Sequence, residues 1–367
     1  MNSGKWFSLL LILLSSAACS GIAARGSVGG QTIDSRVDSE VARYYLASYL
    51  AGERADAALD ERIDHIYRSA NGRLPDRRTL KHLSDEFSLD FASLYLADQI
   101  ARSPINRRFR DAFERVRDYT RNNFRTGRVS LPSQAADFEV LFVPGYLYKR
   151  VKVTGADFAV PRLALQRAGI LQHFVETQED AAVEENADLV AAAIRARAQT
   201  GRRLILISAS KSGPEVALAL TKLALTETRK VAAWINAVGS LQGTPLADER
   251  SLPEVERLGQ VNSAGMESLT TERSRQRFDA FRIPEHICVV NYIGIPVTGS
   301  ISSLGNLGFS SLRKYGPNDG ITLLSDSIFP SGVTLVELGR DHFLLNVEMD
   351  VTTVALTNTI ISWIEQR

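Results

Sequence analysis

Short runs of aliphatic and β-branched residues alternate with helical stretches over the later part of the sequence, and this alternation most constrains the fold. Helical patterns at Ala181–Ala198 and Pro214–Leu225 separate consecutive runs. Strands that alternate with helices form a mostly parallel sheet with helices on both faces. The sequence therefore predicts an α/β domain over residues 131–367. The predicted strands are Glu139–Val143, His173–Glu176, Leu204–Ser208, Val231–Asn236, His286–Ile293 and Val333–Leu338.

A different periodicity precedes this domain. Over residues 37–130 apolar residues recur at spacings of three and four, as in Val41, Tyr44 and Tyr45, which is typical of amphipathic helices. Prolines interrupt the pattern where new helices would begin, so we expect an all-helical region of four or five helices. Its last helix is rich in arginine. That composition fits a solvated helix face better than a surface for anionic lipid.

The first residues have the pattern of an export signal. Lys5 precedes the apolar run Trp6–Leu14, and small residues follow up to Ala18. The run is too short to cross a bilayer, which takes about 20 apolar residues. We expect residues 1–18 to be a signal peptide. Residues 19–36 contain several glycines and few large apolar side chains, which predicts a flexible tether.

Cys19 follows Ala17 and Ala18, and this arrangement resembles the lipid-attachment site of bacterial lipoproteins. Ser16 stands where that site usually has leucine. The resemblance implies a lipid on Cys19 that anchors the protein to a membrane. Since Ser20 rather than aspartate comes next, it also implies the periplasmic side of the outer membrane, in a bacterial cell envelope. Soluble export after cleavage near Ala18 is the alternative.

Overall charge and residue counts exclude several classes of partner. Lys and Arg number 43 against 42 Asp and Glu, so no global field would attract nucleic acid. Two cysteines and five histidines are too few for a disulfide scaffold or a repeated zinc motif. The sequence also lacks a glycine-rich phosphate cradle and a dinucleotide fingerprint. We therefore expect no metal, no cofactor and no nucleic-acid partner.

The residues after the predicted strand Leu204–Ser208 form the most informative motif. Ser210 lies at the centre of Ser208-Ala209-Ser210-Lys211-Ser212, and a helix begins near Pro214. A serine on such a strand-to-helix turn is exposed as a nucleophile beside a helix amino terminus, and small flanking residues keep the turn free of clashes. The usual motif has glycine at the positions of Ser208 and Ser212. Taken alone, the motif also fits an anion-binding turn.

A catalytic serine needs a base and a carboxylate that orients it. His342 follows the last predicted strand, whereas the other four histidines lie in the helical region or at strand starts. Asp319 lies in a tight turn before that strand and is the preferred carboxylate. Asp326 and Asp341 are the alternatives, although Asp341 is directly adjacent to His342 and could hardly reach its ring.

Ser210, Asp319 and His342, in this order, resemble the catalytic residues of the α/β-hydrolase superfamily, particularly its lipase and esterase branch. The segment Gly239–Ala247 is also similar to a loop of bacterial lipase relatives. The resemblance covers residues 137–367. It implies an oxyanion hole made by the backbone N–H of Lys211 and by that of Tyr146 or Leu147, although proline precedes Gly145 where many lipases have histidine.

The resemblance implies a serine hydrolase that cleaves carboxylic esters, lipid esters among them, through an acyl-enzyme. It also implies a helical cap at residues 246–284, for which an insertion without a role is the alternative. The same three residues would serve an acyltransferase, in which an alcohol or amine takes the place of water. A third hypothesis is a non-catalytic envelope lipoprotein that keeps the fold and binds a partner through its helical region.

Overall fold

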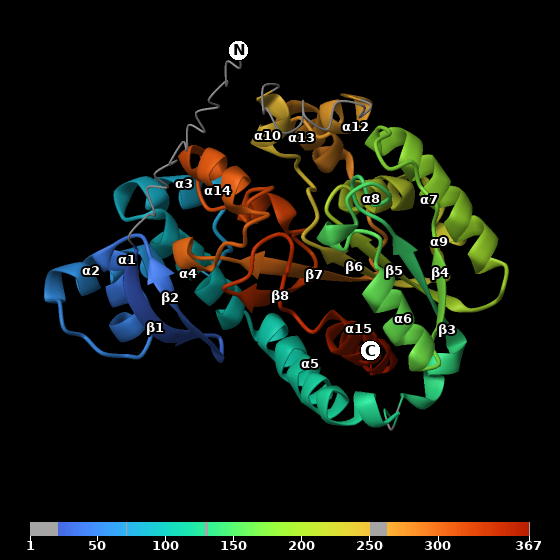
Figure 1. Cartoon of the computed structure of the whole chain (residues 1–367), viewed down its shortest axis with the longest axis horizontal. Coiled ribbons are helices and arrows are strands. Elements are labelled where there is room, and N and C mark those ends of the chain that lie inside the picture. Colours follow the sequence, from blue (N-terminus) through green and yellow to red (C-terminus); the bar gives the residue numbers. More distant parts are fainter. Residues whose placement is uncertain (1–20, 71, 128, 130, 250–262, 367) are drawn as a thin grey trace, which may run out of the picture.

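The computed structural model describes residues 21–70, 72–127, 129, 131–249 and 263–366. Six strands of this part form one parallel sheet in the order β4-β3-β5-β6-β7-β8 (Figure 1). Each strand coincides with a predicted run or is displaced by a short step, which confirms the α/β fold. The strands are β3 (Phe138–Val143), β4 (Leu171–Phe174), β5 (Arg203–Ala209), β6 (Val231–Ala237), β7 (Cys288–Ile295) and β8 (Val333–Leu338).

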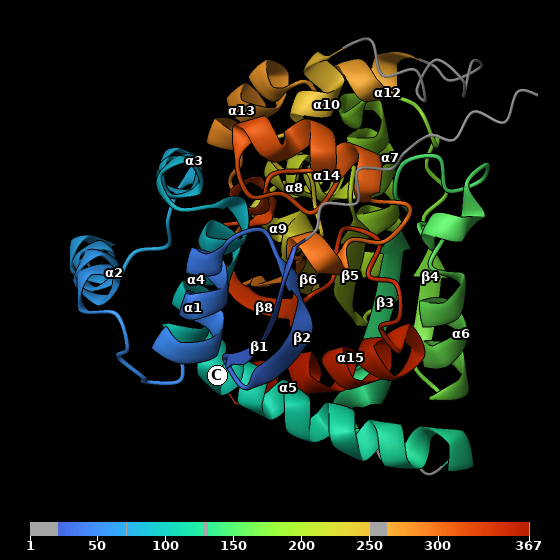
Figure 2. The same ribbon diagram turned by 60° about the vertical axis from the view of Figure 1, so that its left-hand side comes forward.

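Helices cover both faces of the sheet (Figure 2). Ile205 and Ile207 of β5 enter the core under one helical layer, whereas Leu204 and Leu206 enter the core under the other. Successive side chains of a strand point to opposite faces, so one apolar strand serves both cores. The first layer contains α5 (Pro104–Asn123), α6 (Ala159–Arg167) and α15 (Met349–Glu365), and the second contains α7 (Val183–Ala198), α8 (Ser212–Lys222) and α9 (Leu225–Thr228).

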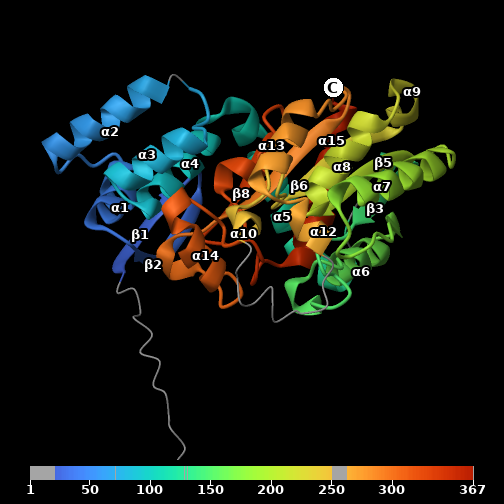
Figure 3. The same cartoon turned by 90° about the horizontal axis from the view of Figure 1, so that it is seen from above.

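The helical region packs beside β8 at one end of the sheet (Figure 3). Its helix α4 is buried over most of its length and shares a core with Ile293 and Ile295 of β7. This shared core joins the helical region to the sheet in one folded unit. The helices are α1 (Glu40–Tyr44), a π-helical turn (Tyr45–Tyr49), α2 (Ala57–Ala70), α3 (Arg77–Glu86) and α4 (Leu89–Arg102).

The tether expected over residues 19–36 is wrong from Ile22 onward. β1 (Ile22–Val28) and β2 (Gln31–Val37) form an antiparallel hairpin. Gly29 and Gly30 both have positive φ, 58° and 83°, as a two-residue hairpin turn requires. Every fourth residue of each strand is buried, the residues midway between are half-buried and those in between are exposed, which is the period of two typical of a strand. The buried residues are Ala24, Val28, Ile33 and Val37.

Side chains of the hairpin and of α5 form hydrogen bonds with the backbone of β8, the last strand at that edge of the sheet. The Gln31 side chain accepts a hydrogen bond from the Leu338 N–H (2.8 Å) and donates one to the Val336 carbonyl. Asn106 of α5 accepts the N–H of Thr334 at 2.9 Å. An uncovered edge strand offers these groups to any other chain, so the two side chains block edge-to-edge pairing.

Short helices occupy the remaining segments. The described residues of the segment 246–284 form short helices joined by turns. Arg277 ties it to α7 through hydrogen bonds of 2.9 and 2.7 Å to Glu184. The helices are α10 (Pro245–Asp248), α12 (Ser263–Glu267), α13 (Thr271–Ala280) and, further along, α14 (Asn306–Leu312).

The expected signal peptide and Cys19 lie outside the described residues. Within the described ranges, no helix is both long enough and apolar enough to cross a membrane.

Candidate active site

Ser210 lies on a strained turn between β5 and α8. Its φ is +56°, in the left-handed region that costs a non-glycine residue about 1–2 kcal/mol. The surrounding backbone fixes this conformation. The Ser210 N–H donates to the Ala237 carbonyl (3.0 Å), and the Ser210 carbonyl accepts from the N–H groups of Gly213 (3.0 Å) and Ser240 (3.1 Å).

The serines that replace the usual glycines are accommodated without clashes. The Ser212 hydroxyl donates to the carbonyl at the end of β3, Val143 (2.7 Å), and accepts the Ala209 N–H (2.8 Å). Ser208 is fully buried, and its hydroxyl accepts the indole N–H of Trp234 at 2.8 Å. Both hydroxyls are thus hydrogen-bonded, so the departure from glycine supports the turn.

His342 and Asp319 form a buried hydrogen-bonded pair. The distance between His342 Nδ1 and Asp319 Oδ2 is 2.8 Å, and the His342 backbone N–H donates to the Asp319 carbonyl, also at 2.8 Å. The other carboxylate oxygen accepts the N–H groups of Ile321 (2.9 Å) and Thr322 (2.8 Å). These bonds fix the carboxylate and leave Nε2 as the ring nitrogen open to other partners.

The two alternative carboxylates have other positions. Asp341 accepts the N–H groups of Ser302 (2.8 Å) and Phe343 (3.1 Å), so its carboxylate faces a turn rather than the imidazole. Asp326 lies 3.6 Å from Arg77 and lines a different cavity. Of the three candidates, Asp319 is the one hydrogen-bonded to the His342 ring.

Ser210 and His342 line the same cavity, which has a volume of about 810 Å³. This volume is in the range of small-molecule sites. Apolar side chains form most of the wall, including Leu147, Phe158 and Val238. Val160 on α6 and Val153 before it stand on the rim and are 56% and 66% exposed.

Backbone strain is concentrated around this cavity. In the described part of the chain six non-glycine residues have positive φ, and all six line it. Strained residues persist only where the surrounding structure enforces them, and they cluster at functional sites. Five of the six residues lie outside the serine turn, so this concentration marks the cavity as a candidate functional site independently of the serine motif. The residues are Leu147, Phe158, Ser210, Val238, Leu344 and Asn346.

The expected oxyanion donors differ in availability. The Leu147 N–H donates to the Glu179 carbonyl at 3.0 Å. Because a bonded amide is not free for substrate, the expectation that Leu147 is an oxyanion donor is wrong. Neither the Tyr146 N–H nor the Lys211 N–H donates to another described residue. Gly145 brings the Tyr146 loop close to the serine turn, since an added Cβ would lie 3.1 Å from the Ala209 carbonyl oxygen.

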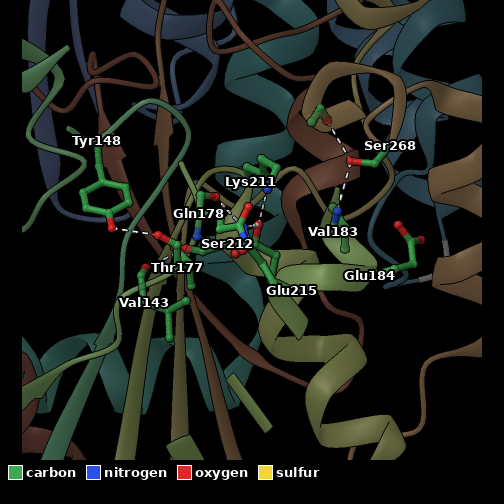
Figure 4. A network of polar contacts seen from close by, with 12 residues as sticks. Val143, Tyr148, Thr177, Gln178, Val183, Glu184, Lys211, Ser212, Glu215 and Ser268 are labelled. Carbon is green, nitrogen blue, oxygen red and sulfur yellow. Dashed lines mark hydrogen bonds and ion pairs between the residues drawn. The ribbon is translucent and has the colours of Figure 1, made fainter. Parts of the chain in front are cut away.

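A buried ion pair under the serine turn was not predicted. The Lys211 ammonium contacts a carboxylate oxygen of Glu215 one helical turn along α8 (Figure 4). Asn186 of α7 donates to the same oxygen at 2.9 Å. Burial raises the pKa of the Glu215 carboxyl, and Lys211 opposes that shift. The sequence signal, Lys and Glu four residues apart, resembles any surface pair on a helix.

The described residues of the expected cap, 246–249 and 263–284, do not line this cavity. Instead, α12 packs on the loop after β3, because an added Cβ at Gly265 would lie 2.9 Å from the Tyr146 ring.

Solved structures similar to this one are esterases and lipases. A metagenomic carboxyl esterase has 18% sequence identity and a TM-score of 0.53, over 65% of this chain and 78% of that chain. A Bacillus licheniformis lipase in its mature form has 24% identity and a TM-score of 0.47, over 56% of this chain and 85% of that one. Its propeptide form has 25% identity and a TM-score of 0.49, over 60% and 50%.

The likeness to the carboxyl esterase shows that the chain has an α/β-hydrolase fold. No protein-family model matches the sequence, and no curated protein matches it either.

Proposed function

We propose that this protein is a serine hydrolase that cleaves carboxylic esters through Ser210, His342 and Asp319. The observation that carries the proposal is the 2.8 Å hydrogen bond that His342 Nδ1–H donates to Asp319, because this histidine lines the same cavity as the strained serine. A carboxylate in that position holds the imidazole in the tautomer whose Nε2 can accept a proton.

The chemistry follows from these roles. The Ser210 hydroxyl attacks the ester carbonyl carbon as His342 Nε2 takes its proton, and Asp319 stabilises the imidazolium. The N–H groups of Lys211 and Tyr146 stabilise the oxyanion. The leaving alkoxide takes the proton from Nε2, which leaves an acyl-enzyme. Water, deprotonated by the same nitrogen, then releases the acid and restores Ser210.

The cavity wall favours an ester with an apolar acyl group. The cavity of about 810 Å³ has apolar walls, so transfer of a hydrocarbon chain from water into it is favourable and stabilises binding. The exposed valines on its rim, Val153 and Val160, would face a substrate that enters from a lipid phase. Lipid esters are therefore included in the proposed substrate class.

A series of p-nitrophenyl esters of increasing chain length tests the proposal on purified protein. We expect turnover to fall to background in Ser210→Ala and in His342→Ala, with thermal melting little changed. His65→Ala, at an exposed histidine of α2, is the matched control and should keep full activity. Full turnover in either cavity variant would refute the assigned roles.

A fluorophosphonate probe separates an enzyme from a binding protein with the same fold. Labelling that disappears in Ser210→Ala supports catalysis, and absence of labelling in folded protein supports the binding role. If added glycerol diverts the acyl group into a new ester faster than water releases it, the reaction is acyl transfer.

We also propose export to the bacterial envelope and lipid attachment at Cys19. The Ala17-Ala18-Cys19 sequence supports this proposal. Cys19→Ser should move the protein from the membrane fraction to the soluble fraction, and continued membrane association would contradict lipid attachment.

A further inference from the structure

A second cavity, of about 710 Å³, lies between the helical region and the loops of the sheet domain. It shares no lining residue with the cavity at Ser210. The start of α3 forms one wall, α13 forms another, and the turns on either side of the Asp319 loop complete it. The proposed hydrolysis therefore does not explain this cavity.

Basic side chains line this second cavity. Lys81 and Lys314 pair with the outlying carboxylates of Asp85 and Glu249. Arg78 and Arg275, by contrast, form no ion pair within 4.0 Å with a described residue. From a greater distance, Arg78 adds to the lowering of the Asp76 pKa by the Thr79 hydrogen bonds, and Arg275 opposes the rise that burial causes in the pKa of Asp326. Asp76 on the wall already caps α3 by accepting the Thr79 N–H at 2.8 Å. Two guanidinium groups are thus available to an anion. The basic residues are Arg77, Arg78, Lys81, Arg275 and Lys314.

Asp326 and Arg77 present unmet polar atoms on the same wall. Asp326 is 1% exposed, and its Oδ2 lies 3.6 Å from Arg77 Nη1, too far for a hydrogen bond. Neither atom has a hydrogen-bond partner among the described residues. Buried polar groups are nearly always hydrogen-bonded in native proteins. The 3.6 Å ion pair thus leaves a donor and an acceptor in the cavity wall without hydrogen bonds, and a ligand in the cavity can supply both partners.

We propose that this cavity binds a phosphate group that carries a neighbouring hydroxyl group. Guanidinium groups bind phosphate oxygens with two parallel hydrogen bonds, which assigns Arg78, Arg275 and Arg77 to the phosphate. The Asp326 carboxyl is assigned to the hydroxyl, because a carboxylate oxygen accepts hydrogen bonds but repels phosphate. Free phosphorylated polyols and the headgroups of glycerophospholipids share this chemistry.

Binding measurements on the full chain test the proposal, with Cys19→Ser as background so that no lipid anchor contributes. Calorimetry measures inorganic phosphate and glycerol 3-phosphate, and flotation compares phosphatidylglycerol vesicles with phosphatidylcholine vesicles. Arg78→Gln/Arg275→Gln should weaken binding about tenfold or more. Arg25→Gln/Arg229→Gln removes the same charge from exposed positions elsewhere and should bind as the parent does.

Asp326→Ala tests the hydroxyl contact, with Asp326→Asn as the second variant if alanine prevents folding. Either change should reduce the ratio of the affinity for glycerol 3-phosphate to the affinity for inorganic phosphate. An equal affinity of the parent protein for these two ligands would show that Asp326 does not contact a ligand hydroxyl group.

The pattern of binding identifies the ligand source. Binding of free glycerol 3-phosphate supports a soluble ligand. Binding of phosphatidylglycerol vesicles alone, lost in Arg78→Gln/Arg275→Gln, supports a lipid headgroup. Folded parent protein that binds none of the probes, or a double variant that binds as the parent does, overturns the proposal. These readouts do not depend on ester hydrolysis, so this site and the Ser210 site can fail separately.

Discussion

Replacing Lys211 with methionine tests how the buried ion pair contributes to the fold under the serine turn. The side chains of Lys211 and Glu215 are 2% and 1% exposed, and Asn186 is the other donor to the Glu215 carboxylate. Methionine fills similar space but leaves a buried carboxylate with one neutral donor. Breaking one side of a buried pair costs about 3–5 kcal/mol, so we expect a loss of that size in the free energy of unfolding.

The loss of unfolding free energy in Lys211→Met should depend on pH. Burial already raises the pKa of Glu215, and removal of the ammonium would raise it further. A carboxyl whose folded-state pKa is raised contributes stability below its unfolded pKa, and this contribution is lost as pH rises through the folded pKa. The penalty of Lys211→Met should therefore be larger at alkaline pH than at mildly acidic pH.

Urea unfolding followed by circular dichroism measures both effects. Lys222→Met is the matched control on the same helix, because Lys222 pairs with Asp188 at 2.6 Å with side chains 38% and 68% exposed. An exposed pair contributes about 0–1 kcal/mol. Adding Glu215→Gln to Lys211→Met should restore most of the stability. Equal losses in Lys211→Met and Lys222→Met would refute the reasoning.

Three other changes have defined outcomes. Asp319→Asn should lower kcat for ester hydrolysis by about 10⁴-fold, whereas Asp341→Asn should leave it nearly unchanged. Burial raises the pKa of Asp326 to about 7, so wild-type stability should fall as pH rises toward 7, by up to about 4 kcal/mol. Urea titrations should show that fall reduced in Asp326→Asn. Gln31→Ala should cost about 1–3 kcal/mol and promote self-association, measured by urea unfolding and light scattering; full stability without association would contradict the edge-sealing role.

Much of the sheet could be predicted because its strands carry local signals. The runs that became β3, β5, β6 and β7 are buried on both faces, as central parallel strands are, and the Ser210 turn directly follows one of them. His342 could be chosen because it follows the last strand. The order of the strands and the pairing of side chains required the fold itself.

The features that were missed depend on tertiary contacts. The sequence favoured Asp319 but kept Asp326 and Asp341 as alternatives, because which carboxylate faces His342 depends on turns far from one another in the chain. The availability of the Leu147 N–H was hidden because its partner is the carbonyl of Glu179. The hairpin at residues 22–37 had a strand period, but its small and polar residues resembled a linker.

The contacts of Gln31 with β8 have a consequence for how the molecule is made. They join positions 305 and 307 residues apart, so they can form only after the chain has been synthesised as far as Leu338. Long-range contacts of this kind form late, because closing such a large loop has to precede them. Until then the last strand has an open side. A fragment that lacks either Gln31 or β8 should therefore be prone to intermolecular strand pairing. The sheet should be complete only once its last strand, β8, has been synthesised.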